Sequence, residues 1–108
     1  MNNHISVTAR CPIRTTMELV GGKWKLLILF QLREEALRTS ELKRRIPDIS
    51  EKMLIQELKV LVINQLVERY DFQEQPPRVE YQLTARGRSA LPLIVEMKRF
   101  AEAYEALG

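Results

Sequence analysis

The feature that most constrains this chain is a pair of amphipathic segments joined by a very short link. Thr39 is expected to cap the first helix, and Pro47 ends it because proline disrupts a helix interior. The link has three residues, 47–49, and Ser50 is then expected to cap a second, longer helix. Two helices joined by so tight a turn form a helix-turn-helix, which we predict over residues 39–64.

The second helix has two unlike sides on a helical wheel of about 100° per residue. Lys52, Gln56 and Lys59 form an outward stripe that carries no acid. A glutamine amide can pair with adenine in the major groove, and lysine can reach guanine or phosphate. An ordinary solvated face has the same composition, but the place of this stripe in a helix-turn-helix favours DNA recognition. The opposite side is the predicted core face: Leu54, Ile55, Leu58, Leu61 and Val62.

A β-hairpin is expected directly after this helix. Residues 67–73 are moderately strand-like, and residues 79–84 alternate apolar and polar side chains as a half-buried strand does. Pro76-Pro77 stiffens the tip, and Arg78 follows. Its guanidinium either enters the minor groove or binds phosphate, or it faces solvent in a plain turn. We therefore predict a wing over residues 67–84. The predicted DNA-binding residues are Ser40, Lys43, Arg44, Ser50, Lys52, Met53, Gln56, Lys59 and Arg78.

Two of these assignments have alternatives. Met53 flanks the stripe and either touches a thymine methyl or packs in the core, and packing is favoured. Lys43 and Arg44 belong to a basic run that is expected to contact phosphates, and Ser50 with the first-turn amides suits a phosphate as well.

The segment 85–107 is predicted to be a dimerisation helix. Leu93, Met97, Phe100, Tyr104 and Leu107 are spaced 4, 3, 4 and 3 residues apart, as in a heptad seam. A domain of 108 residues needs only part of such a surface for its own core, so a second copy is the favoured partner. The alternative is that the stripe covers the sheet of its own chain. Pro92 should kink this helix or mark a second start.

The N-terminal part is expected to hold an arm and two helices. Residues 1–12 are predicted to be a flexible arm, and a short helix from Pro12 to Val20 should end at Gly21-Gly22. Leucine-rich residues 23–33 favour a buried helix over a buried strand. The predicted fold is a single α+β, mainly α, winged helix-turn-helix domain over residues 1–108.

Composition restricts the function classes. The chain has 17 Lys and Arg against 14 Asp and Glu, a net charge of +3 that is compatible with nucleic acid without requiring it. His4 is the one histidine, and we find no glycine-rich phosphate loop or metal-ligand set, so no enzyme, cofactor or metal is expected. No apolar run can span a membrane, and the cytoplasm is the expected compartment. A winged helix used only for protein contacts is the second hypothesis.

Several short motifs follow one another along the chain: Cys11-Pro12, Gly21-Gly22-Lys23-Trp24, residues 49–54, Gln56, Leu58-Lys59, residues 76–84, Gly87 and Pro92. In this combination the sequence resembles the HxlR-type family of winged-helix regulators, relatives of the MarR group. The resemblance implies a homodimer built from terminal helices that binds a two-fold symmetric operator on double-stranded DNA, and repression is the expected outcome. Two positions depart from the family pattern. The first is Asn64-Gln65, where the family often has an acidic residue and glycine, so Asn64 is expected to take the left-handed conformation at the end of the helix. The second is Phe100, which stands where tryptophan is usual.

Cys11 has two interpretations. Some members of the family sense oxidants, aldehydes or quinones through a cysteine at this position, which would make an oxidant or small molecule the effector. Arg10 and Arg14 would favour the thiolate, and an arm would leave Cys11 accessible. The other interpretation is an inert cysteine packed at the dimer interface. Because the chain has one cysteine, a switch needs an intersubunit disulfide, a mixed disulfide or an adduct.

Overall fold

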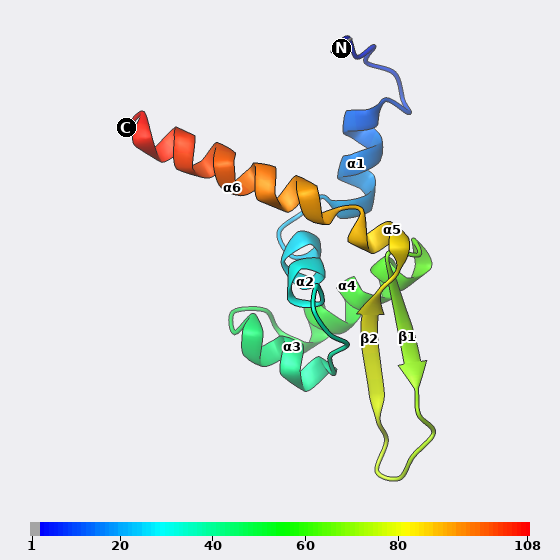
Figure 1. Ribbon diagram of the computed structural model, residues 1–108. Coiled ribbons are helices and arrows are strands. Elements are labelled where there is room, and N and C mark those ends of the chain that lie inside the picture. Colours follow the sequence, from blue (N-terminus) through cyan, green and yellow to red (C-terminus); the bar gives the residue numbers. More distant parts are fainter. Residues whose placement is uncertain (1–2) are drawn as a thin grey trace.

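The computed structural model describes residues 3–108 as a small helical body with a projecting hairpin and two projecting helices (Figure 1). The fold is α+β and mainly helical, as predicted. The elements follow in the order α1 (Pro12–Val20), α2 (Lys25–Gln31), α3 (Thr39–Arg45), α4 (Glu51–Ile63), β1 (Val67–Asp71), β2 (Val79–Leu83), α5 (Ala85–Arg88) and α6 (Leu91–Ala106).

The core lies where α2, α3 and α4 meet the base of the hairpin. Its side chains are hydrophobic, and all but Tyr81 are aliphatic, so its stability comes mainly from removing apolar surface from water. The leucine-rich segment is the buried helix α2, as predicted, although Leu27 and Phe30 remain 44% and 36% exposed. The most deeply buried members include Ile28, Leu29, Leu42, Leu54, Leu58 and Leu61.

The helix-turn-helix forms as predicted, with one correction at its start. Arg38, not Thr39, is the N-cap of α3, and its backbone N–H donates to Glu41 Oε1 at 2.9 Å. Because the Glu41 carboxylate reaches back to this amide, the helix begins without a hydroxyl cap at Thr39. Ser50 caps α4 as predicted, since its Oγ accepts from the Met53 amide at 3.1 Å.

The hairpin pairs β1 with β2 in antiparallel register, with Val67 opposite Leu83 and Arg69 opposite Tyr81. A third segment, which the sequence did not reveal, joins its edge. The Leu37 amide donates to the Tyr81 carbonyl at 2.9 Å, and the Tyr81 amide donates to the Leu37 carbonyl at 2.8 Å. This single bridge anchors the wing to the residues just before α3, and one residue pair is too short to leave a periodic signal.

The turn between α4 and β1 departs from the expectation for Asn64. Asn64 has φ of −82°, and Gln65 takes the left-handed conformation with φ of 61°. Two hydrogen bonds hold Gln65 there: its carbonyl accepts from Thr84 Oγ1 at 2.6 Å, and its Oε1 accepts from Arg86 Nη1 at 2.7 Å. Contacts with the following segment therefore offset the conformational cost that glycine would avoid.

The C-terminal segment is two helices rather than one. α5 ends at Arg88, and α6 starts again with Pro92 in its first turn, so the second of the two alternatives for Pro92 is correct. α6 contacts α2 and extends away from the hairpin (Figure 1), so its stripe does not cover the sheet of its own chain.

The N-terminal segment begins its first helix at Pro12, and Gly22 follows that helix with φ of 93°. Residues 1 and 2 of the predicted arm lie outside the described residues, and residues 3–10 are exposed. Within residues 3–108, every helix is too short or too polar to cross a membrane.

One largely buried ion pair connects α2 to α4. Lys25 Nζ lies 2.7 Å from Glu57 Oε2, and the two side chains are only 15% and 17% exposed. Glu57 stands on the side of α4 that faces the body, so this pair and the leucines together determine how α4 is rotated about its axis.

We expect Lys25→Met to lower the free energy of unfolding by roughly 3 kcal/mol, because it leaves the Glu57 carboxylate largely buried without its partner. The double variant Lys25→Met/Glu57→Met should recover most of the loss, because no unpaired charge remains. Urea denaturation at one fixed protein concentration measures both. Lys98→Met is the control, since its pair with Glu102 is 76% and 65% exposed and should be worth less than about 0.5 kcal/mol. Equal stability of Lys25→Met and the wild type would contradict the prediction.

Candidate nucleic-acid interface

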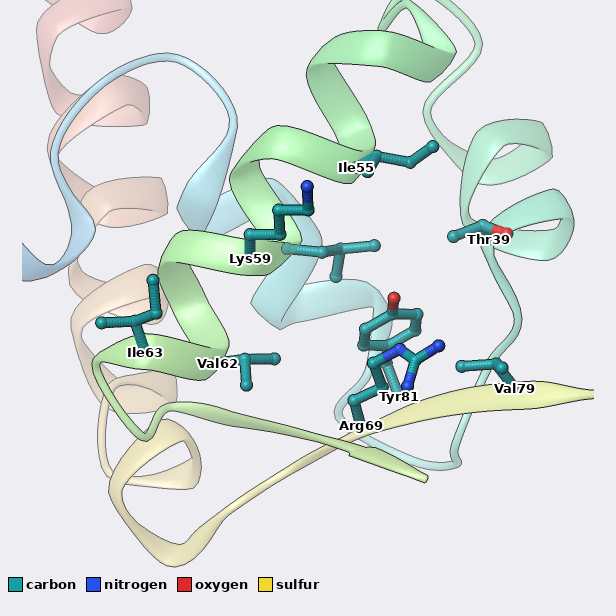
Figure 2. Close-up of a pocket in the computed structure, with 9 residues that line it drawn as sticks. Thr39, Ile55, Lys59, Val62, Ile63, Arg69, Val79 and Tyr81 are labelled. Atoms are coloured by element: carbon teal, nitrogen blue, oxygen red, sulfur yellow. The ribbon is translucent and has the colours of Figure 1, made fainter. Parts of the chain in front are cut away.

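The outward face of α4 is arranged as the sequence predicted, with one exception. Lys52, Gln56 and Lys59 are all exposed, and the buried leucines lie on the opposite side of the helix. Ile55 was expected in the core but is 40% exposed. The reason is geometric, because the leucines fill the narrow side that α4 turns toward the body, and Ile55 falls at the edge of that side, where its side chain points toward α3 (Figure 2).

The start of α4 combines a cap with an exposed position. Ser50 is exposed, and its Oγ already accepts from the Met53 amide, so its hydroxyl proton remains to be donated. Met53 is half-buried and packs against the core cluster, which agrees with the packing interpretation. Its side chain is therefore a less available base contact than Gln56.

The candidates on α3 differ in how freely they can reach a duplex. Lys43 Nζ donates to the Pro47 carbonyl at 2.8 Å and is thus tied to the end of its own helix. Arg45 Nη2 lies 3.0 Å from Glu35 Oε1. Ser40 and Arg44 are exposed, and neither side chain bonds another residue within the described part of the chain. Arg44 is accordingly the cation of α3 whose side chain has no hydrogen-bond or ion-pair partner among residues 3–108.

Arg78 neither projects freely from the wing nor sits idle in a plain turn. Its Nη2 lies 3.1 Å from Glu80 Oε2, and its Nη1 lies 3.7 Å from Glu74 Oε1. Its guanidinium also stacks over the ring of Phe72, with 3.9 Å from Cζ to the ring centroid. These contacts hold Arg78 on the hairpin and offset its charge in the free protein.

Arg69 is a cation that the sequence reasoning did not select. It lies on β1 directly opposite Tyr81, and its side chain stands in the space between the hairpin and α4 (Figure 2). The side chain makes no ion pair or hydrogen bond to residues 3–108. The strand alternation was the available signal, because Arg69 shares its face of β1 with buried Val67.

The stripe on α6 is uncovered in the single chain. Exposure rises along it, from 37% at Leu93 and 48% at Met97 to 73% at Phe100, 72% at Tyr104 and 91% at Leu107. The Phe100 and Tyr104 rings stack with centroids 6.4 Å apart. So long a row of exposed apolar side chains is unusual on a monomer and marks an interaction surface.

Cys11 is buried, with only 4% of its surface exposed, so the expectation that an arm leaves it accessible is wrong. It is the residue before α1, and its carbonyl accepts the Thr15 amide at 2.9 Å. Its own amide donates to the Thr8 carbonyl at 3.3 Å, which closes a turn over residues 8–11. Residues 3–108 contain no cluster of potential metal ligands.

Comparison with known proteins agrees with this geometry. A model of the HxlR-like helix-turn-helix family matches residues 19–107. The HTH-type transcriptional regulator YkvN of Bacillus subtilis is 45% identical over 94 residues, which are 87% of this chain and 80% of YkvN. A MarR-family transcriptional regulator from Porphyromonas gingivalis W83 superimposes with a TM-score of 0.84 at 47% identity, covering 90% of this chain and 95% of that one. Reduced YodB from B. subtilis gives a TM-score of 0.78 at 35% identity, and the match covers 91% of this chain and 97% of the YodB chain. YodB has also been solved bound to quinone.

Proposed function

Because the chain belongs to the HxlR-like helix-turn-helix family, it is a DNA-binding transcriptional regulator and not an enzyme, and we propose that it binds a two-fold symmetric operator as a homodimer and represses transcription. The observation that carries the proposal is the exposed, acid-free stripe Lys52–Gln56–Lys59 on the second helix of the motif. A winged helix that only bound proteins would not need this stripe. A dimer seated on an operator represses simply by excluding other proteins from that stretch of duplex.

In this proposal the residues divide into base readers and phosphate contacts. Gln56 lies in the middle of the stripe and reads a base edge, and Lys52 and Lys59 flank it. Ser50, Ser40 and Arg44 contact phosphates, since they are exposed at the start of α4 and on α3. Three predicted DNA-binding residues keep only supporting roles at this surface, because their side chains already contact the core, a backbone carbonyl or nearby carboxylates: Met53, Lys43 and Arg78.

We expect Gln56→Ala to relax preference at one base position in each half-site, because a bidentate glutamine–adenine pair supplies about 1–3 kcal/mol of discrimination. Lys59→Ala should weaken all sequences alike and reduce the salt slope by about one, as loss of a phosphate contact does. Sites are first selected from random duplexes, and a base-by-base binding profile is then measured for each variant. Identical binding profiles for Gln56→Ala and the wild type would show that Gln56 does not read a base. A wild-type affinity for DNA that does not change with salt concentration would contradict DNA binding altogether.

The dimer proposal uses the exposed stripe of α6. Pairing two copies along Met97, Phe100 and Tyr104 would cover the apolar surface that a single chain leaves in water. It would also hold two copies of α4 in a fixed relation, which a two-fold operator requires, with half-sites about one helical turn apart or a multiple of it.

Phe100→Asp should produce monomers, because a carboxylate in the paired seam would be desolvated without a partner. Operator affinity should fall steeply, because each monomer contacts only one half-site. Light scattering and the DNA-binding titration measure the two effects. Lys98→Asp is the matched control, since Lys98 lies on a different side of α6 and is 76% exposed. A wild type that is already monomeric would contradict the seam.

We further propose that Cys11 makes the protein responsive to electrophiles. The structural relative YodB, solved in a quinone-bound form, supports this proposal. Because Cys11 is only 4% exposed, the residues that cover it have to move before the thiol can react. In the reaction, sulfur bonds to a ring carbon of the quinone. The thiol proton and the displaced ring proton end on the two ring oxygens, so the adduct is a hydroquinone.

Treatment with benzoquinone should add one quinone mass to the wild type and weaken operator binding, because the bulky adduct cannot fit where the thiol is buried. Cys11→Ser, which keeps a side chain of similar size, should gain no such mass and keep its affinity. Intact-mass spectrometry and the DNA titration are run on the same samples. An unmodified wild type, or equal loss of affinity in Cys11→Ser, would assign Cys11 a structural role.

A further inference from the structure

α4 carries one unpaired acid at the surface that meets DNA in the proposed function. Of its two acids, Glu57 is paired with Lys25, whereas Glu51 is exposed and its side chain makes no hydrogen bond or ion pair to residues 3–108. Glu51 directly precedes Lys52, the first member of the outward stripe, so the two stand about 100° apart around the helix. The acid is therefore next to the stripe without belonging to it.

Glu51 lines a groove on this face of α4. Glu51, Ile55 and Lys59 follow one another at every fourth position, and Lys52 and Gln56 form the row of side chains beside them. All five residues line the groove, and all five are exposed. The carboxylate of Glu51 therefore faces the same part of a bound duplex as Gln56, which reads a base edge in the proposed function.

The charge of Glu51 opposes binding to DNA in general. Phosphates flank the major groove, and like charges that are brought together at an interface lower the affinity for every sequence. A base that donates a hydrogen bond to the carboxylate offsets this loss, because hydrogen bonds to a charged group are the stronger ones. A base that presents an acceptor adds a further repulsion. An acid at this position thus favours one base by penalising the others, which is one of the two ways in which specificity arises.

Cytosine is the base that fits a carboxylate best. Its major-groove edge offers the N4 amino donor and no acceptor. Guanine presents the acceptors N7 and O6, and thymine presents O4, so both repel a carboxylate, while adenine combines a donor at N6 with an acceptor at N7. Lys52, the next residue, suits the acceptors of the guanine that pairs with this cytosine. Glu51 and Lys52 together therefore complement the two halves of one C·G pair.

We propose that Glu51 selects a cytosine in each half-site of the operator by accepting a hydrogen bond from its N4 amino group. The proposal rests on the function proposed above, because it needs α4 in the major groove. Glu51 and Gln56 are five residues apart, which corresponds to about 7.5 Å along the helix axis. Base pairs are stacked about 3.4 Å apart, so the cytosine lies within about two or three base pairs of the base that Gln56 reads.

Glu51 also has an effect that does not involve DNA. It stands in the first turn of α4, where a carboxylate stabilises a helix through the helix dipole. This effect changes the free energy of unfolding, and it is the same whichever base lies opposite the side chain. The dependence of affinity on base identity is therefore the measurement that separates selection of a base from stabilisation of the helix.

The test compares the wild type with Glu51→Gln on duplexes that the wild type selects from random sequence. The amide keeps the size of the side chain but pairs best with adenine. Base-by-base profiles should show one cytosine per half-site for the wild type, and the variant should shift the preference at this position toward adenine by at least about fivefold. Asp48→Asn is the matched control, because Asp48 is an exposed acid of the link before α4 that does not line the groove. Its loss should leave every base preference unchanged.

A second titration uses two operators that differ only in carrying cytosine or adenine at this position of both half-sites. The wild type should bind the cytosine operator more tightly, by about fivefold for each half-site and about 25-fold for both, and Glu51→Gln should lose or reverse this preference. Thermal unfolding without DNA reports the dipole effect separately. Unchanged base preference in Glu51→Gln, including a uniform gain of affinity for all sequences, would overturn the proposal and leave the proposed function standing. A wild type that binds no duplex would overturn both.

Discussion

The structure depends on how α4 is held by its inner side. Leu54, Leu58 and Leu61 are almost completely buried, and the Lys25–Glu57 pair adds a directional contact with α2. Aliphatic burial alone tolerates some rotation of a helix, because dispersion and hydrophobic terms have little directionality. An ion pair with 2.7 Å between its charged atoms tolerates much less. Together they place Lys52 and Gln56 on the outer side, so the stability of the core and the orientation of the reading face have the same origin.

Tyr81 links this core to the wing. Its backbone pairs with Arg69 on one side and with Leu37 on the other, and its side chain belongs to the buried core cluster. A hairpin alone is marginally stable in water. The Leu37 bridge and the buried side chain of Tyr81 therefore fix the base of this hairpin relative to the helical body.

The sequence predicted the elements whose signal is periodic and local. The two sides of α4, the cap at Ser50, the alternation of residues 79–83 and the α6 stripe all follow from spacing and side-chain chemistry. It did not predict features set by contacts between distant residues. Two features depend on where other parts of the chain lie: the Leu37 bridge and the left-handed Gln65, which Thr84 and Arg86 hold. The burial of Cys11 likewise left no periodic signal in the sequence. Ile55 was misplaced for the same reason, since a helical wheel cannot show how much of an apolar arc the neighbouring elements cover.

Net charge is a poor guide to where this protein meets DNA, and the structure shows why. The hairpin and its tip carry Glu68, Asp71, Glu74 and Glu80 against only Arg69 and Arg78, and Arg78 is already paired with two of these acids. On α3, Lys43 and Arg45 are tied to a carbonyl and a carboxylate. Among the cations of α3, α4 and the hairpin, the side chains without a partner in residues 3–108 are those of Lys52, Lys59, Arg44 and Arg69. A phosphate backbone attracts uncompensated charge, because a cation already paired must first give up its partner. In the proposed complex Arg69 would therefore add an unpaired cation to the side of the wing that faces α4, although the wing as a whole is acidic.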